Sequence, residues 1–266
     1  MADEPDDVDA MVEPVVPSRH RWLAGLLGAQ PGDRMVDLGC GTGASLTQVA
    51  PDLRGGVAVG VDASLAVLAR AADELAPAVT AGATRVLLVQ ADLKDRLPFP
   101  DAAFDRIICH NVLEFLPDPD GFAAEAGRVL CPDGRLVLSH SDFDTLVFAS
   151  EDVELTRRLV RAYSDAQQPW MDAVDGTIGR RLAGIAGRAG LAVLDVQAQV
   201  VLGRRFAPGE LGWGYAHNLA EALAGCGAAD RAELDGWLAG LRRLDAEGAF
   251  MFSLNDYAVI CGRMRR

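Results

Sequence analysis

The stretch Val36-Asp37-Leu38-Gly39-Cys40-Gly41-Thr42-Gly43 decides how this chain folds. A short aliphatic run that begins at Arg34 ends here in a turn with three glycines, and a helical pattern opens at Ala44. Glycine lacks a side chain, so it adopts positive φ angles and lets a ligand approach the backbone closely. The stretch therefore predicts a strand, a tight turn and a helix N-terminus, with N–H groups that can face the anionic group of a ligand.

Further aliphatic runs alternate with helical patterns after this turn. The predicted helices cover 43–50, 64–75 and 119–130, and the predicted strands cover 34–38, 56–61, 85–90, 104–109 and 134–139. Strands that alternate with helices indicate a parallel sheet, and strands that are apolar almost throughout indicate that helices cover both of its faces.

The alternation breaks after Ser139. A mostly helical stretch at about 151–190 precedes a predicted strand at 192–201, and helices at about 208–246 precede a last strand at 256–264. We find no internal repeat and no low-complexity linker.

Composition limits the classes of partner. The chain of 266 residues is 50% apolar, which suits one large α/β domain with a sizeable core. Its 25 basic and 38 acidic residues give a net charge of −13, and no basic patch stands out, so nucleic acid is an unsuitable partner. Six of the acidic residues crowd the first fifteen positions, which predicts a disordered acidic tail over 1–15 and a single domain over 16–266.

Cysteine usage and hydropathy indicate the setting. The five cysteines are scattered and form no C-x-x-C pair, so neither a disulfide framework nor a zinc site is indicated, and a reducing, cytoplasmic setting fits best. No apolar run reaches the ~18 residues of a membrane helix, and the N-terminus carries no secretion signal. The sequence therefore predicts no membrane partner and no metal.

Asp62 lies at the end of the second predicted strand, nineteen residues after Gly43. An ionised carboxylate there can accept hydrogen bonds from the two vicinal hydroxyls of a ribose, which indicates a ligand that contains a nucleoside. The pattern Gly39-x-Gly41-x-x-Ala44 also satisfies the relaxed dinucleotide fingerprint. At this point a nicotinamide-dependent oxidoreductase remains an alternative.

A family resemblance favours a different nucleoside-containing ligand over a nicotinamide cofactor. Asp37–Gly43 resembles the first signature of class I S-adenosylmethionine-dependent methyltransferases, in the branch of ubiquinone/menaquinone-biosynthesis and natural-product enzymes, and dehydrogenases rarely carry the acidic residue before the glycines. The likeness spans residues 20–264. Segments that match in order are Asp62-Ala63-Ser64, Gln90-Ala91-Asp92-Leu93, 97–105, His110-Asn111-Val112-Leu113, 128–135 and the last strand, 252–260.

The resemblance implies a fold and a cofactor. The fold is α/β, a doubly wound, mostly parallel seven-stranded sheet of the Rossmann-like methyltransferase type. Its antiparallel last strand would lie beside 192–201, with helical lid insertions at about 141–190 and 203–250. The cofactor would be S-adenosyl-L-methionine and the product S-adenosyl-L-homocysteine.

The resemblance also assigns residues to this cofactor. The three glycines of the turn would line its methionyl part, Asp37 would orient the loop or the ammonium group, and Asp62 would hold the ribose. Arg21 matches a family arginine that can pair with the methionine carboxylate. The full set of expected cofactor contacts is Arg21, Asp37, Gly39, Gly41, Gly43, Asp62, the adenine neighbours Ala63, Ser64, Asp92 and Leu93, and His110 and Asn111.

Three histidines are candidate catalytic bases, because imidazole exchanges protons near neutral pH. His110 follows the fourth predicted strand, where its family counterpart borders the cofactor. His140 follows the fifth, with Asp142 and Asp144 close by in sequence. His217 lies on a predicted helix that lines the acceptor pocket in relatives. Loop hydrogen bonding or core packing is the alternative for each of them.

Apolar residues around the expected lid provide a candidate acceptor pocket. They are Phe143, Phe148, Trp170 and Met171, and core packing is their alternative role. Arg180 belongs to a segment that recurs in this branch, and it would either tie the lid down or meet the acceptor.

We therefore expect transfer of a methyl group to oxygen, nitrogen or carbon of a small-molecule acceptor, by a monomer or homodimer. Alanine- and arginine-rich usage indicates a high-GC bacterium and secondary metabolism. Two alternatives remain: a quinone-biosynthesis C-methyltransferase, and a cofactor-binding homologue that acts as a cyclase or scaffold without methyl transfer.

Overall fold

The structure is a computed structural model that describes residues 17–80, 84–166 and 176–264. The expected acidic tail, 1–15, and two of the candidate pocket residues, Trp170 and Met171, lie outside the described residues.

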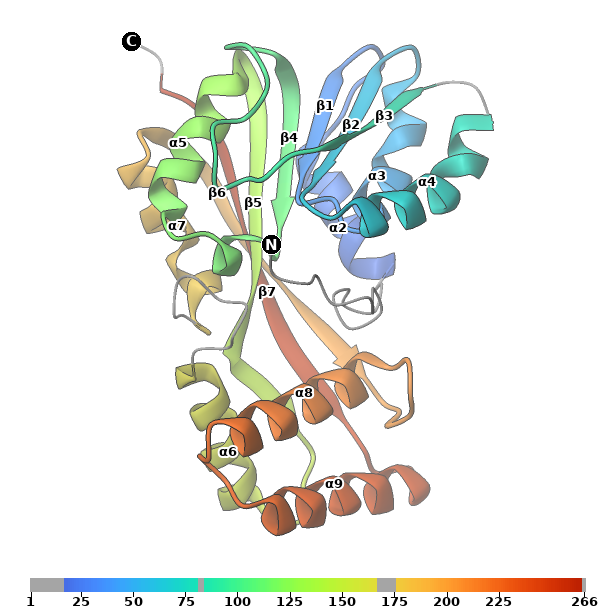
Figure 1. Cartoon of the computed structure of the whole chain (residues 1–266), viewed down its shortest axis with the longest axis vertical. Helices are drawn as coiled ribbons and strands as arrows, with labels where there is room; N and C mark the ends of the chain where they lie inside the picture. The colour runs from blue at the N-terminus through green and yellow to red at the C-terminus, as the bar shows by residue number, and fades with distance from the viewer. Residues whose placement is uncertain (1–16, 81–83, 167–175, 265–266) are drawn as a thin grey trace.

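One seven-stranded sheet in the order β3-β2-β1-β4-β5-β7-β6 organises the described chain (Figure 1). The neighbours from β3 to β5 pair in parallel, whereas β7 lies between β5 and β6 and is antiparallel to both. This confirms the expected doubly wound sheet with an antiparallel last strand. The strands are β1 (Arg34–Leu38), β2 (Val57–Asp62), β3 (Arg85–Gln90), β4 (Phe104–His110), β5 (Leu130–Phe148), β6 (Leu191–Gly203) and β7 (Phe252–Arg263).

Helices cover both faces of the sheet. One face packs against α5 (Pro119–Val129) and α7 (Ile178–Arg188) through a continuous apolar cluster. The other packs against α2 (Pro17–Leu27), α3 (Ala44–Val49) and α4 (Leu65–Thr80). Short 3₁₀ turns follow α3 and β4, at η1 (Ala50–Leu53) and η2 (Leu113–Phe115).

A second helical region surrounds the far ends of β5, β6 and β7, as Figure 1 shows. It contains α6 (Val153–Asp165), α8 (Leu211–Gly225) and α9 (Arg231–Ala246). Its own core is aromatic, and in it Phe252 of β7 packs on Phe148 and Tyr215 with ring centroids 5.2 and 5.8 Å apart. None of the helices in the described ranges is long and apolar enough to cross a membrane.

The strand β5 is longer than the sequence indicated, since it covers nineteen residues and not only 134–139. It extends from the parallel sheet into the helical region, and its pairing with β7 shifts register between Asp142 and Val147. Thr145 fills this bulge by donating a hydrogen bond to the carbonyl oxygen of Asp142 (2.6 Å) and accepting one from the N–H of Asn255 (3.0 Å). Such bulges bend a strand and redirect its side chains. Here the bulge begins after Asp142, two residues beyond His140.

Candidate functional site

The glycine turn follows β1 at the edge where the parallel strands end. Gly39, Gly41 and Gly43 have φ angles of +78°, +51° and +83°, in the left-handed region that favours glycine. A Cβ atom at Gly39 would overlap the side chain of Val112, and one at Gly43 would lie 2.9 Å from Leu75 Cδ1. At Gly41 no atom lies within 4 Å of that position. Gly39 and Gly43 thus allow the turn to pack tightly, and Gly41 faces open space.

Hydrogen bonds within the protein already use four N–H groups of this turn. Those of Gly39 and Cys40 donate to the carbonyl oxygen of Val61, at 2.8 and 2.9 Å, and that of Gly43 donates to Cys40. The N–H of Gly41 donates to Asp62 Oδ2 at 3.0 Å. This differs from the expectation that the turn presents its N–H groups to an anion, because the bonds instead hold the turn against β2.

The Asp62 carboxylate is half-buried at the end of β2 and points toward the glycine turn. Besides the bond from Gly41, its Oδ1 accepts a hydrogen bond from the N–H of Ser64 at 3.0 Å. Each carboxylate oxygen has more than one acceptor site, so both can still accept bonds from ligand hydroxyls. The hydroxyl of Ser64 accepts from the N–H of Val67 in the first turn of α4, and neighbouring Ala63 is exposed.

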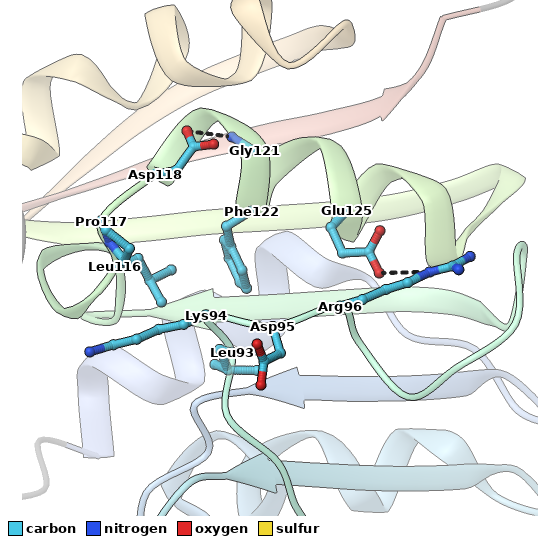
Figure 2. A pocket seen from close by; sticks show the side chains of 10 residues that line it. All are labelled: Leu93, Lys94, Asp95, Arg96, Leu116, Pro117, Asp118, Gly121, Phe122 and Glu125. Carbon is cyan, nitrogen blue, oxygen red and sulfur yellow. Dashed lines mark hydrogen bonds and ion pairs between the residues drawn. The ribbon is translucent and has the colours of Figure 1, made fainter.

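Two of the expected adenine neighbours, Asp92 and Leu93, follow β3. Asp92 is exposed, and its Oδ1 accepts a hydrogen bond from the N–H of Lys94 at 2.9 Å. Leu93 is buried, and Figure 2 shows it with Leu116 and Phe122 around a cavity of about 230 Å³ beneath α5. The glycine turn is not part of this cavity, which therefore only adjoins the expected cofactor site at Leu93.

Asp37 is a buried acid beside the turn. Its side chain is 2% exposed, and we find no hydrogen bond or ion pair to its carboxylate from the described residues. Burial, together with the charge of Asp62, raises its pKa to about 8. A cationic group placed there would favour the ionised form. An acid of this kind beside the open space at Gly41 fits an amino-acid ammonium group, so these residues suit S-adenosylmethionine.

His110 is the last residue of β4, and His140 lies within β5. Burial lowers the pKa of His110 well below its usual value, with the charge of Arg19 as a smaller cause. Its Nδ1 lies 3.1 Å from Ser139 Oγ, and its buried Nε2 has no hydrogen-bond partner among the described residues. Because the protonated form is disfavoured, His110 is a poor proton acceptor and a neutral neighbour for a ligand.

His140 is buried and is held in one tautomer. Its Nδ1 lies 2.7 Å from the carbonyl oxygen of Ser141, which can only accept, so Nδ1 carries the proton and Nε2 is the basic nitrogen. Nε2 lies 3.9 Å from Oε1 of Glu114, a buried residue on η2. This distance is too long for a hydrogen bond and suits an ion pair once the imidazole is protonated. No local pattern indicates Glu114, because it lies on a short turn 26 residues before His140.

The carboxylates that the sequence placed near His140 bind Arg180 instead. Arg180 Nε and Nη2 donate to Asp142 at 2.6 and 2.5 Å, and Nη1 donates to Asp144 at 3.1 Å. Arg180 therefore ties α7 to β5, and its role toward the lid or the acceptor stays a prediction.

His217 lies apart from these groups, within the helical region. Its ring stacks on Trp213 (centroids 3.9 Å apart) and on Phe206 (5.8 Å). Its Nδ1 donates to the carbonyl oxygen of Trp213, and Nε2 lies 3.4 Å from Arg242 Nη2. These contacts belong to the packing of α8 and α9.

The structure also distinguishes two arginines of α2. Arg21 is exposed, whereas Arg19 is 1% exposed and pairs with the buried Asp256 of β7, Nε to Oδ2, at 2.6 Å. Arg19 belongs to none of the sequence motifs named above. Its spacing of four from Leu23 and eight from Leu27 could have placed it on the buried face of the helix.

The raised pKa of Asp37 predicts how stability changes with pH. The folded chain holds this proton up to about pH 8, whereas the unfolded chain releases it near pH 4, so the free energy of unfolding should fall as pH rises across that window. Asp37→Asn should flatten this dependence and stabilise the ligand-free protein at pH 8 by roughly 1–3 kcal/mol. Urea unfolding at pH 5, 6.5 and 8 measures this. Parallel pH curves for the two proteins would contradict it.

The open space at Gly41 predicts unequal effects of alanine in the turn. Both Gly39→Ala and Gly41→Ala place a side chain in a left-handed conformation, at a cost of about 1–2 kcal/mol. Only Gly39→Ala also forces a Cβ into Val112. Denaturant unfolding should show a loss at Gly39 that exceeds the loss at Gly41 by at least about 1 kcal/mol. Equal losses would mean that Val112 moves aside freely.

Comparison with known proteins finds a family match for part of the chain. The model of a family described as "Methyltransferase domain" matches residues 36–138, from β1 into β5. The matching curated proteins include an uncharacterized 37.1 kDa protein in transposon TN4556 of Streptomyces fradiae, 36% identical over 64% of this chain and 46% of that protein. They also include 27-O-demethylrifamycin SV methyltransferase of Amycolatopsis mediterranei, at 35% over 50% of this chain and 47% of the relative. The demethylmenaquinone methyltransferase of Tropheryma whipplei is 38% identical over 45% of this chain and 46% of that protein.

The chain thus spans about half the length of the curated relatives it matches. Solved structures extend the likeness of the fold to most of the chain. The YcgJ protein of Bacillus subtilis is 21% identical with a TM-score of 0.61, over 93% of this chain and all of that one. The [4+2]-cyclase SpnF is 20% identical with a TM-score of 0.57, over 93% of this chain and 81% of the cyclase. Residues 36–138 are thus similar to the family described as "Methyltransferase domain", and the solved structures show the same fold over most of the chain.

Proposed function

We propose that this protein transfers a methyl group from S-adenosylmethionine to a hydroxyl oxygen of a small-molecule acceptor. The observation that carries the proposal is the buried His140–Glu114 pair at the same sheet edge as the acids Asp37 and Asp62. Of the three acceptor atoms considered above, a hydroxyl oxygen has the greatest need of a base, because it must lose a proton as it is methylated.

The acids and the open side of the turn would hold the cofactor. Asp37 would pair with its ammonium group, Asp62 would accept bonds from its ribose hydroxyls, and Gly41 would leave room for the methionyl chain. Ser64 and Leu93, with their neighbours Ala63 and Asp92, would border the adenine. The bound cofactor supplies an electrophilic methyl group on a positively charged sulfur.

His140 is the proposed base. Its Nε2 would take the proton of the acceptor hydroxyl during methyl transfer. The Glu114 carboxylate would stabilise the imidazolium that forms. The neutral His110, at the end of the adjacent strand β4, would border the methyl group without adding a charge.

The curated relatives support a hydroxyl of a natural product as the acceptor. The name of the rifamycin relative specifies methyl transfer to an oxygen. The demethylmenaquinone relative supports the quinone-biosynthesis C-methyltransferase as the second candidate. Mass spectrometry of the product formed with a deuterated methyl donor separates an O-methyl ether, a C-methyl product and an unlabelled cyclised product.

Cofactor binding tests the site. We expect micromolar binding of S-adenosylhomocysteine by calorimetry and no binding of NAD. Asp62→Ala should weaken S-adenosylhomocysteine binding by roughly 1–3 kcal/mol, since it removes both the ribose contact and the anchor of Gly41. NAD binding without S-adenosylhomocysteine binding would overturn the proposed function, and unchanged affinity in the variant would remove Asp62 from the site.

The proposed base has a separate test. His140→Gln keeps a polar side chain but cannot accept the proton, so kcat should fall by roughly 10²–10⁴-fold while the affinity for S-adenosylhomocysteine stays within about twofold. Single-turnover methyl transfer with saturating cofactor measures this. A variant with full kcat would show that the reaction needs no base at this position.

A further inference from the structure

Ser141 lies in β5 directly after His140, and its side chain is fully buried. We propose that Ser141 is a positioning residue that holds the cofactor-side turn and the catalytic histidine in one arrangement. This inference rests on the proposed function, and it assigns a role to polar contacts that the methyl-transfer step itself does not use.

All three polar groups of Ser141 form hydrogen bonds, and together they reach Asn111, Asp256 and His140. Its N–H donates to Asn111 Oδ1 at 2.8 Å, and its hydroxyl donates to Asp256 Oδ1 at 2.7 Å. The hydroxyl oxygen also accepts from Asn111 Nδ2 at 3.3 Å. The carbonyl oxygen accepts the Nδ1–H of His140 and so fixes its tautomer. One residue therefore contacts both the residue after β4 and the proposed base.

The bonds to Asn111 stabilise a strained backbone beside the glycine turn. Asn111 has a φ of +51°, a left-handed conformation that costs free energy in a residue other than glycine. Asparagine tolerates it better than most residues because its short side chain can form local hydrogen bonds. The next residue, Val112, packs where a Cβ of Gly39 would lie. The conformation at Asn111 thus determines where Val112 packs against the glycine turn.

The bond to Asp256 connects the same point to α2. Arg19 donates to Asp256 from Nε at 2.6 Å and from Nη2 at 3.3 Å, and both side chains are buried. A buried ion pair adds little net stability, because desolvation offsets its attraction, but it fixes the orientation of its members. The following residue, His20, has its Nδ1 3.0 Å from Ser45 Oγ on α3. Helix α2 is therefore bonded to β7 through Arg19 and to α3 through His20.

These contacts give Ser141 an effect that a merely structural hydroxyl would lack. Without the hydroxyl, Asp256 loses a donor and Asn111 loses one of its two bonds to this residue. The strained turn is then less well fixed in the form that the cofactor meets. Cofactor affinity should fall together with stability, and substitutions at Asn111 and Ser141 should not be additive, because both act through the same bonds.

Thr156 on α6 provides a matched control. It is buried, its hydroxyl donates to the carbonyl oxygen of Asp152 (2.9 Å), and the hydroxyl accepts from Trp237 Nε1 (2.9 Å), within the helical region. Ser141→Ala and Thr156→Ala each remove a buried hydroxyl with two hydrogen bonds. Both should lower the melting temperature. Only Ser141→Ala should weaken S-adenosylhomocysteine binding, by roughly five- to fiftyfold in calorimetry.

Asn111→Gly provides the second arm, and it keeps the inference testable if Ser141→Ala does not fold. Glycine accepts the positive φ but makes no bond to Ser141, so this variant should bind S-adenosylhomocysteine more weakly by a similar factor. In the double variant Asn111→Gly/Ser141→Ala, the fold-loss of S-adenosylhomocysteine affinity should be smaller than the product of the two single fold-losses.

The outcomes separate the two proposals. Wild-type protein that does not bind S-adenosylhomocysteine would overturn the proposed function. Wild-type protein that binds it, with either single variant within twofold of wild type, would overturn the role of Ser141 and leave the proposed function intact. Equal losses of affinity in Ser141→Ala and Thr156→Ala would also overturn it, because they would reflect stability alone.

Discussion

The bond from the N–H of Gly41 to the Asp62 carboxylate is the interaction on which the rest of the site depends. It joins the turn after β1 to the end of β2, so two strands that are adjacent in the sheet present one continuous surface. Because Asp62 also accepts from Ser64, the same carboxylate fixes the start of α4. The glycines at 39 and 43 let this turn pack against Val112 and Leu75, which leaves Gly41 as the position where a ligand can approach. The carboxylate of Asp62 at the end of β2 therefore holds the glycine turn in shape even when no ligand is bound.

Much of the fold could be predicted from the sequence because its parallel strands are almost wholly apolar. The bounds of β1 and β3 match the aliphatic runs at 34–38 and 85–90. The length of β5 could not be predicted in this way. Beyond Ser139 its residues include Ser141 and Asp142, which interrupt the aliphatic pattern and yet are paired with β7, and Thr145, which lies in the bulge. Ser141 binds Asn111 and Asp256, and Asp142 binds Arg180, and these partners come from distant parts of the chain.

The candidate site was predictable only where the chemistry is local. The glycine turn and Asp62 have a characteristic spacing, and the structure brings them into contact. Proximity in sequence was misleading for His140, because Arg180 competes for Asp142 and Asp144 and a distant residue, Glu114, lies beside the imidazole. Nothing near Glu114 in the sequence indicates that pairing, since it depends on how η2 folds back toward β5. The arginine on α2 could have been identified from helical periodicity, which places Arg19, and not Arg21, on the buried face.

Several features of this edge are unfavourable without a ligand. Asp37 is buried as an acid with a raised pKa, Asn111 is in a left-handed conformation, and His110 has a buried Nε2 with no hydrogen-bond partner among the described residues. Each would be destabilising in a site with no function, and together they lie within one short stretch of the sheet edge. A ligand with a cationic group and hydrogen-bonding groups would relieve at least the first of these penalties. Ligand binding would then be more favourable by the amount of this unfavourable free energy that it removes. In the ligand-free protein, the contacts of Ser141 prevent the turn from relaxing into a less strained conformation.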